Sequence, residues 1–111
     1  MTVTIPVRVR EAYDVHVGVD LLPTLPNYVS SRQVLVVTDE HVARHHLQPV
    51  VRILEDADRR VVPFIVPARE ASKSVRTWEA GLRQLASNAF GRDDVVLALG
   101  GGVVGDLAGF L

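Results

Sequence analysis

The chain has 111 residues, of which 48% are hydrophobic and 23% are charged, and its formal net charge is −1. This length supports one small domain, and the near-neutral charge argues against nucleic acid or an acidic membrane surface as a partner. The absence of cysteine excludes disulfides, thiolate zinc sites and cysteine nucleophiles. No apolar run approaches the roughly 20 residues that a membrane-spanning helix needs, and the first residues do not resemble a secretory signal. We therefore expect a cytoplasmic protein.

The first thirty residues predict two short strands and a helix. Apolar and polar residues alternate over 2–10, which predicts an edge strand with one buried face. A second short strand is predicted over 13–17, and Gly18 turns the chain after it. Residues 21–29 predict a short helix, with Asp20 as its candidate N-cap.

The rest of the chain alternates apolar strands with helices. Strands are predicted over 33–38, 61–66 and 95–99, and helices over 42–58, 74–88 and about 104–111. Continuous β-branched runs are typical of strands buried on both faces of a parallel sheet. The order predicts an α/β fold, a Rossmann-like parallel sheet with flanking helices, over residues 1–111. We expect this sheet to be incomplete at the C-terminus, because the next strand is not in the sequence.

A glycine-rich loop follows the last predicted strand. Gly100, Gly102 and Gly105 fit the pattern G-x-G-x-x-G between a strand and a helix. Glycine leaves no Cβ between main-chain N–H groups and a ligand, and a helix N-terminus attracts phosphate. The pattern therefore indicates a nucleotide-phosphate site. The alternative is a glycine-rich turn that only lets the helix and the strand pack closely.

Four segments together resemble one enzyme family. The string ALGGGVVGDLAGF over 98–110 resembles the signature of 3-dehydroquinate synthases. Three other segments agree with that family in order and spacing: YDVHVG over 13–18 with the leucines at 21–22, VVTD over 36–39, and PAREASKS over 67–74. The resemblance covers the whole chain but only about the first third of the family's usual length, so we expect these residues to form its N-terminal NAD-binding domain.

The resemblance implies a set of NAD-binding residues, namely Asp39, Glu70, Lys73, Gly101, Gly102, Val103 and Asp106. Asp39 would accept hydrogen bonds from ribose hydroxyls. Glu70 and Lys73 would lie along the cofactor, and Asp106 would sit beside it. Backbone groups of the three residues in the glycine loop would face the pyrophosphate. Plainer roles stay open: Asp39 as a helix N-cap, Glu70 and Lys73 as an exposed loop pair, and Asp106 as an acid favoured by the helix dipole.

Two residues depart from the family pattern, and two histidines have metal-ligand spacing. Arg69 stands where glycine is common, and its side chain would disfavour a positive φ. His41 stands where asparagine is common. His41 and His45 are four residues apart, as helical metal ligands are, but a solvated helix face is the alternative. The family's zinc or cobalt ligands, a glutamate and two histidines, belong to a helical second domain that has no counterpart here.

The resemblance also implies a reaction. The family converts the sugar-acid phosphate DAHP to 3-dehydroquinate and phosphate in the shikimate pathway, with NAD reduced and then reoxidised. The full-length enzyme would be a homodimer, and no catalytic or metal-binding residue falls within this chain, which we expect to be inactive alone. The alternatives are another sugar-phosphate cyclase of the aminocyclitol type, a non-catalytic NAD-binding module, and a relative of the metal-dependent alcohol dehydrogenases.

Overall fold

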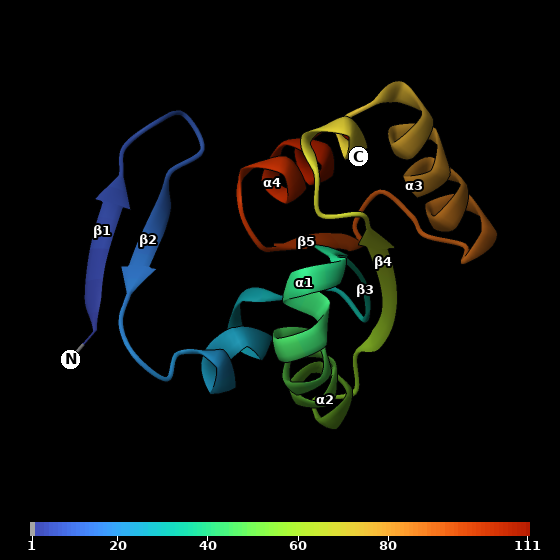
Figure 1. The fold of residues 1–111 in the computed structure, drawn as a ribbon. Helices are drawn as coiled ribbons and strands as arrows, with labels where there is room; N and C mark the ends of the chain where they lie inside the picture. Colours follow the sequence, from blue (N-terminus) through green and yellow to red (C-terminus); the bar gives the residue numbers. More distant parts are fainter. Residues whose placement is uncertain (1) are drawn as a thin grey trace.

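A parallel sheet in the order β4-β3-β5 organises the computed structural model, which describes residues 2–111 (Figure 1). The central strand β3 (Gln33–Asp39) pairs with β4 (Arg60–Val66) on one side and with β5 (Val95–Leu99) on the other. The register sets Thr38 of β3 opposite Leu99, so the carboxyl ends of the strands share one edge. The predicted strands are confirmed to within one residue at each end.

Helices cover both faces of this sheet, as predicted. Val34 and Val36 of β3 pack with Leu54 of α2 (Gln48–Asp56) on one face. Leu35 and Val37 point the other way and pack beneath α4 (Gly102–Gly109), while α3 (Val75–Ser87) contributes Leu85 to the same cluster. Successive side chains of a strand point to opposite faces, so a continuous apolar strand builds two cores. Val34 to Thr38 are fully buried, which accounts for the β-branched run.

The predicted helix over 42–58 begins and ends about two residues earlier than expected. It starts as α1 (Glu40–Val42), passes through the π-helical segment η2 (Ala43–Leu47) and continues as α2. Its end is set by Asp58, whose φ is +61°. The N–H of Arg59 donates to the Leu54 carbonyl at 2.9 Å, and the N–H of Asp58 donates to the Glu55 carbonyl. This Schellman geometry satisfies the last helical carbonyls and stops the helix.

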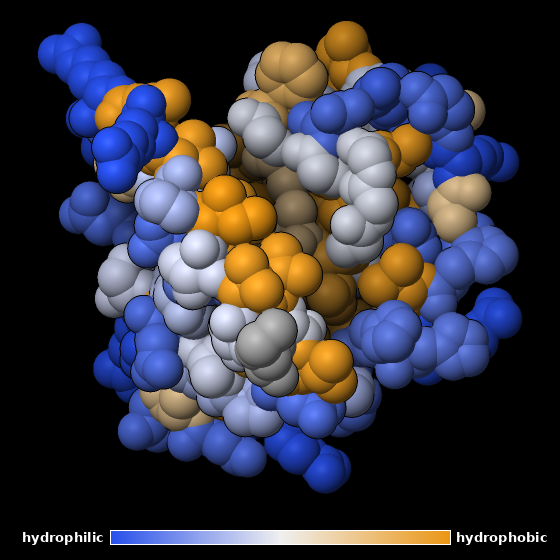
Figure 2. Space-filling model, turned by 90° about the vertical axis from the view of Figure 1, so that its left-hand side faces the viewer, coloured by the Kyte–Doolittle hydropathy of each residue, from blue (hydrophilic) through white to orange (hydrophobic). Residues whose placement is uncertain are grey.

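The two N-terminal strands form a separate hairpin. β1 (Val3–Val7) and β2 (Tyr13–Val17) pair only with each other, in antiparallel register, and stand beside the α/β unit (Figure 1). Both predicted strands are present, but the first ends at Val7 rather than at residue 10, and the predicted buried face is wrong. Val3, Ile5 and Val15 are 46%, 48% and 41% exposed, because no second layer covers them. Figure 2 views this side of the molecule and shows apolar side chains at its surface.

The predicted helix over 21–29 differs in type and in its start. It is the 3-10 helix η1 (Leu22–Tyr28), and the residue at its cap position is Leu21. Asp20 has a φ of +57° and caps nothing, so the N-cap prediction is wrong. Pro26 lies inside this short helix and has no N–H to donate to a helical hydrogen bond.

Candidate functional site

Three segments leave the sheet at its carboxyl edge. The chain leaves β3 at Asp39, β4 runs into the loop 67–73, and β5 runs into the glycine loop at 100–102. The chain passes from β3 to β4 on one side of β3, and then from β4 to β5 on the other side of β3. The direction in which strands are added therefore reverses between β3 and β5. Ligands of open α/β sheets bind in the crevice at such a switch point. The structure therefore brings the predicted segments to one edge.

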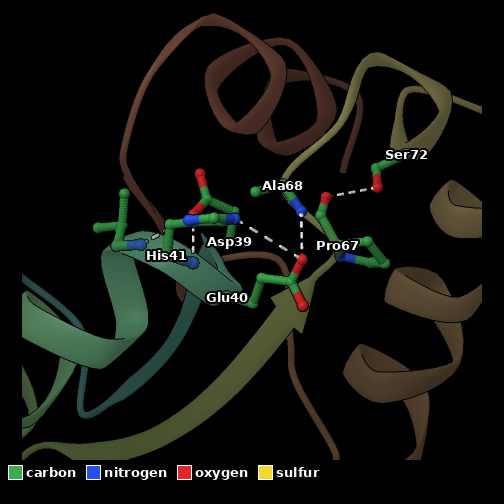
Figure 3. A network of polar contacts seen from close by, with 7 residues as sticks. Asp39, Glu40, His41, Pro67, Ala68 and Ser72 are labelled. Carbon is green, nitrogen blue, oxygen red and sulfur yellow. Dashed lines mark hydrogen bonds and ion pairs between the residues drawn. The ribbon is translucent and has the colours of Figure 1, made fainter.

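Asp39 acts as a helix N-cap. Its Oδ1 accepts hydrogen bonds from the backbone N–H groups of His41 and Val42, at 2.9 and 2.8 Å (Figure 3). This is the plainer of the two roles considered for Asp39. Within the described residues, its second oxygen, Oδ2, accepts no hydrogen bond. The cap therefore occupies only half of the carboxylate.

Lys73 joins two of the predicted residues. Its Nζ lies 2.9 Å from Asp106 Oδ2 and 3.2 Å from Glu70 Oε1. Glu70 opens the short 3-10 turn η3 (Glu70–Ser72), and Asp106 belongs to α4. Hydrogen bonds from Lys73 to Asp106 and then to Glu70 raise the pKa of Lys73 above its usual value of 10.5. Through Lys73 the ion pairs link the loop to α4. The three side chains are partly exposed, so the ion pairs are open to solvent.

The loop 67–73 is braced by two residues that sequence analysis did not single out. Ser72 is buried, and its hydroxyl donates to the Pro67 carbonyl at 2.6 Å. Glu40 Oε1 accepts from the N–H of Ala68 at 3.2 Å (Figure 3). Arg69 has a φ of −155°, which is extended backbone, so this departure from the family pattern requires no left-handed conformation. Glu40 carried no sequence signal, because its partner arrives through tertiary folding.

The glycine loop begins α4 and leaves open space around its first turn. Gly100 has a φ of +145°, and a Cβ there would lie 3.2 Å from Val104, so glycine is needed for both reasons. A Cβ built at Gly101 or Gly102 would meet nothing within 4 Å. The first N–H groups of a helix have no intrahelical partner, and Gly101 at the cap position of α4 supplies no side chain to bond them. Close packing explains Gly100 but not the next two glycines.

The histidine pair does not gather further metal ligands. His41 and His45 are exposed, and His41 Nε2 lies 4.0 Å from Glu40 Oε1. Across residues 2–111, no three histidine, aspartate or glutamate side chains come close enough together to hold a metal ion.

No helix within residues 2–111 has the length and apolar character needed to cross a membrane.

Comparison with known proteins identifies relatives of this chain. Residues 63–111 match the family model of the 3-dehydroquinate synthase N-terminal region. The chain is 40% identical over 104 residues to the 3-dehydroquinate synthase of Bacillus cereus strain B4264, and 39% identical over the same length to that of Bacillus anthracis strain CDC 684. Each alignment covers 89% of this chain and 28% of the relative. The chain thus spans little more than a quarter of these relatives.

A solved structure shares the fold. A crystal structure of 2-deoxy-scyllo-inosose synthase, complexed with carbaglucose-6-phosphate, NAD+ and Co2+, superposes with a TM-score of 0.84 at 18% identity. The superposition covers 98% of this chain and 31% of that one, and it shows the common architecture. The family match over 63–111 includes the motifs over 67–74 and 98–110. The chain therefore matches the N-terminal portion of the 3-dehydroquinate synthases, as its sequence predicts.

Proposed function

We propose that this chain is the NAD-binding part of a 3-dehydroquinate synthase. The observation that carries the proposal is the meeting of Asp39, the loop 67–73 and the open first turn of α4 at the switch point of the sheet. Similarity to the Bacillus enzymes supports this assignment over a general nucleotide-binding role. The complete enzyme would convert DAHP to 3-dehydroquinate and phosphate.

Asp39 can bind a ribose without losing its structural role. Its Oδ1 caps α1, while Oδ2 is free to accept a hydrogen bond from a ribose hydroxyl. The cap holds the carboxylate in place before the cofactor arrives, which lowers the entropy lost on binding. The two roles of Asp39 considered from sequence are therefore compatible.

The pyrophosphate would lie against Gly101, Gly102 and Val103. The unpaired N–H groups and the positive end of the α4 dipole suit an anion, and the two glycines leave room for it. Lys73 adds a positive charge whose position is held by Asp106 and Glu70. When bound, NAD supplies the hydride acceptor and donor for the reaction, while these residues bind and orient it.

The substrate and metal chemistry would come from residues beyond those described. The zinc or cobalt ion, the homodimer and the cytoplasmic location remain predictions from the family resemblance. An aminocyclitol-type cyclase is the second candidate, because the superposed structure is a 2-deoxy-scyllo-inosose synthase. At 18% identity that likeness concerns the fold, whereas the 40% identity to 3-dehydroquinate synthase favours DAHP as the substrate.

Gly101→Ala tests the cofactor site. A methyl group there meets no protein atom within 4 Å, so the variant should unfold at the same temperature as the parent. It would occupy the space proposed for the pyrophosphate, so NAD binding by calorimetry should weaken strongly. Gly109→Ala places a methyl group in equally open space at the far end of α4 and serves as the control. Unchanged NAD binding by Gly101→Ala, or no binding by the folded parent, would contradict the proposal.

The reaction itself requires the remaining part of the enzyme. A protein that joins this chain to the rest of a synthase should release phosphate from DAHP only when NAD is present. A non-catalytic module would bind NAD and release no phosphate in that setting. Assays with other heptulose phosphates and with glucose 6-phosphate would separate the two kinds of cyclase.

A further inference from the structure

We propose that Glu40 is a positioning residue that holds the cofactor loop 67–73 in place beside Asp39. This inference rests on the proposed NAD site and adds a residue that lies outside the predicted set. Glu40 directly follows Asp39 and is the first residue of α1. Its carboxylate reaches across to the backbone of a loop 28 residues further along the chain.

The hydrogen bond from Ala68 to Glu40 joins two of the three segments at the site. Glu40 Oε1 accepts from the Ala68 N–H at 3.2 Å, so the segment after β3 holds the loop after β4 (Figure 3). The backbone of Glu40 is itself fixed, because Asp39 caps the two residues that follow Glu40. The backbone from which the Glu40 side chain extends is therefore tied to the end of β3.

The loop is braced internally, so a hold at Ala68 acts on all of it. Ser72 is 3% exposed and bonds through its hydroxyl to Pro67. The N–H of Ser72 bonds to the Arg69 carbonyl, and that of Lys73 bonds to the Glu70 carbonyl, both at 3.0 Å. Fixing one end of such a unit limits where its charged residues can lie.

Glu40 and Asp106 hold opposite ends of this loop. Glu40 binds the backbone at Ala68, and Asp106 binds the side chain of Lys73 at 2.9 Å. The first bond comes from the β3 side of the site and the second from α4. Because the Glu40 side chain is 57% exposed, its bond adds little to global stability. Its effect should appear in ordering the loop for a ligand, where preorganisation improves affinity.

Two substitutions of Glu40 separate its hydrogen bond from its charge. Glu40→Ala removes the acceptor, and we expect NAD binding about fivefold weaker, with faster hydrogen exchange over 67–73 and an unchanged unfolding temperature. Glu40→Gln keeps an acceptor at the same place and should bind NAD within about twofold of the parent. Glu79→Ala removes an exposed carboxylate of α3 and is the matched control. Parent-like exchange and affinity in Glu40→Ala would overturn the proposal.

A double-mutant cycle tests whether Glu40 acts through the loop. Lys73→Met removes the positive charge that the loop is proposed to place beside the cofactor, so adding Glu40→Ala should weaken NAD binding less than it does in the parent. Fully additive effects would show that Glu40 does not act by placing Lys73. If the parent binds no NAD, the proposed function fails, and hydrogen exchange at 67–73 still decides whether Glu40 holds the loop.

Discussion

Thr38 donates a hydrogen bond of 2.7 Å from its hydroxyl to the carbonyl of Leu99, and it is fully buried. The two residues are paired across β3 and β5, at the last register position before the glycine loop. The next residue is Gly100, where the chain turns with a φ of +145°. A side chain of the central strand thus fixes the place from which the candidate phosphate loop departs.

Thr38→Val should destabilise the fold. The substitution keeps the shape of a fully buried side chain but removes the donor, and it places a methyl group against the Leu99 carbonyl. We expect the free energy of unfolding, measured by urea denaturation, to fall by about 1–2 kcal/mol. Thr38→Ser retains the hydroxyl and should keep the hydrogen bond, losing only the contacts of one methyl group. A Thr38→Val variant as stable as the parent would show that the bond contributes nothing net.

Ala89→Gly should stabilise the protein. Ala89 follows the end of α3 with a φ of +56°, and the N–H of Phe90 bonds to the Leu85 carbonyl, so Ala89 occupies the position at which helices favour glycine. Relieving the left-handed strain should raise the free energy of unfolding by about 0.5–1 kcal/mol. Ala86→Gly, three residues earlier in the helix, should lower it by about 1 kcal/mol. Loss of stability in Ala89→Gly would contradict this account of the cap.

Asp94 should make stability depend on acid pH. The hydrogen bond from the Gly91 N–H, and then that from Ser31, holds the pKa of Asp94 below its usual value of 3.8. A folded-state pKa below the unfolded one means that the carboxylate stabilises the fold above about pH 4, and that this stabilisation is lost as the pH falls through the folded-state pKa. Asp94→Asn should therefore be less stable than the parent at neutral pH, and the difference should shrink on acidification.

Thermal unfolding over a series of pH values checks the Asp94 prediction. Asp93→Asn removes the exposed carboxylate next to it and provides a control of equal charge. If the difference in unfolding temperature between the parent and Asp94→Asn stayed constant from neutral to strongly acid pH, the Asp94 hydrogen bonds would not be the cause of the pH dependence of stability.

The α/β architecture could be predicted from sequence because its signals are local. Val34 to Val37 form an unbroken apolar run, and a strand covered on both faces buries every residue of such a run. The sequence pattern predicts the end of α2 about two residues too late, because nothing in the sequence marks Asp58 as a left-handed residue. The exposure of Ile5 escaped prediction, because strand alternation shows which side chains share a face and not whether another layer covers them.

The candidate site was predictable as a set of residues but not as a geometry. Motifs identified Asp39, Lys73 and Asp106, but the hydrogen bond between the last two spans 33 residues and depends on how the helices pack. The cap formed by Asp39 was among the roles considered, and it leaves one carboxylate oxygen open. The bond from Ala68 to Glu40 was not predictable, because a backbone donor in a loop leaves no mark in the sequence.

Lys73 is the only lysine in the chain, which makes its environment directly measurable. Its hydrogen bonds to Asp106 and Glu70 raise its pKa, so less of the reactive free amine is present at a given pH. Acylation of Lys73 by an amine-selective ester, followed by mass spectrometry, should be slow at pH 8 to 9. Asp106→Asn removes the strongest of these interactions and should speed the labelling.

The N-terminal amine labels in the same experiment and normalises the rate, while Glu79→Gln controls for the loss of one carboxylate elsewhere on the surface. NAD at saturating concentration should slow the labelling of Lys73 further if the cofactor lies beside it. Labelling that is equally fast in the parent and in Asp106→Asn would mean that the ion pair does not persist in solution. Labelling unaffected by bound NAD would place the cofactor away from Lys73.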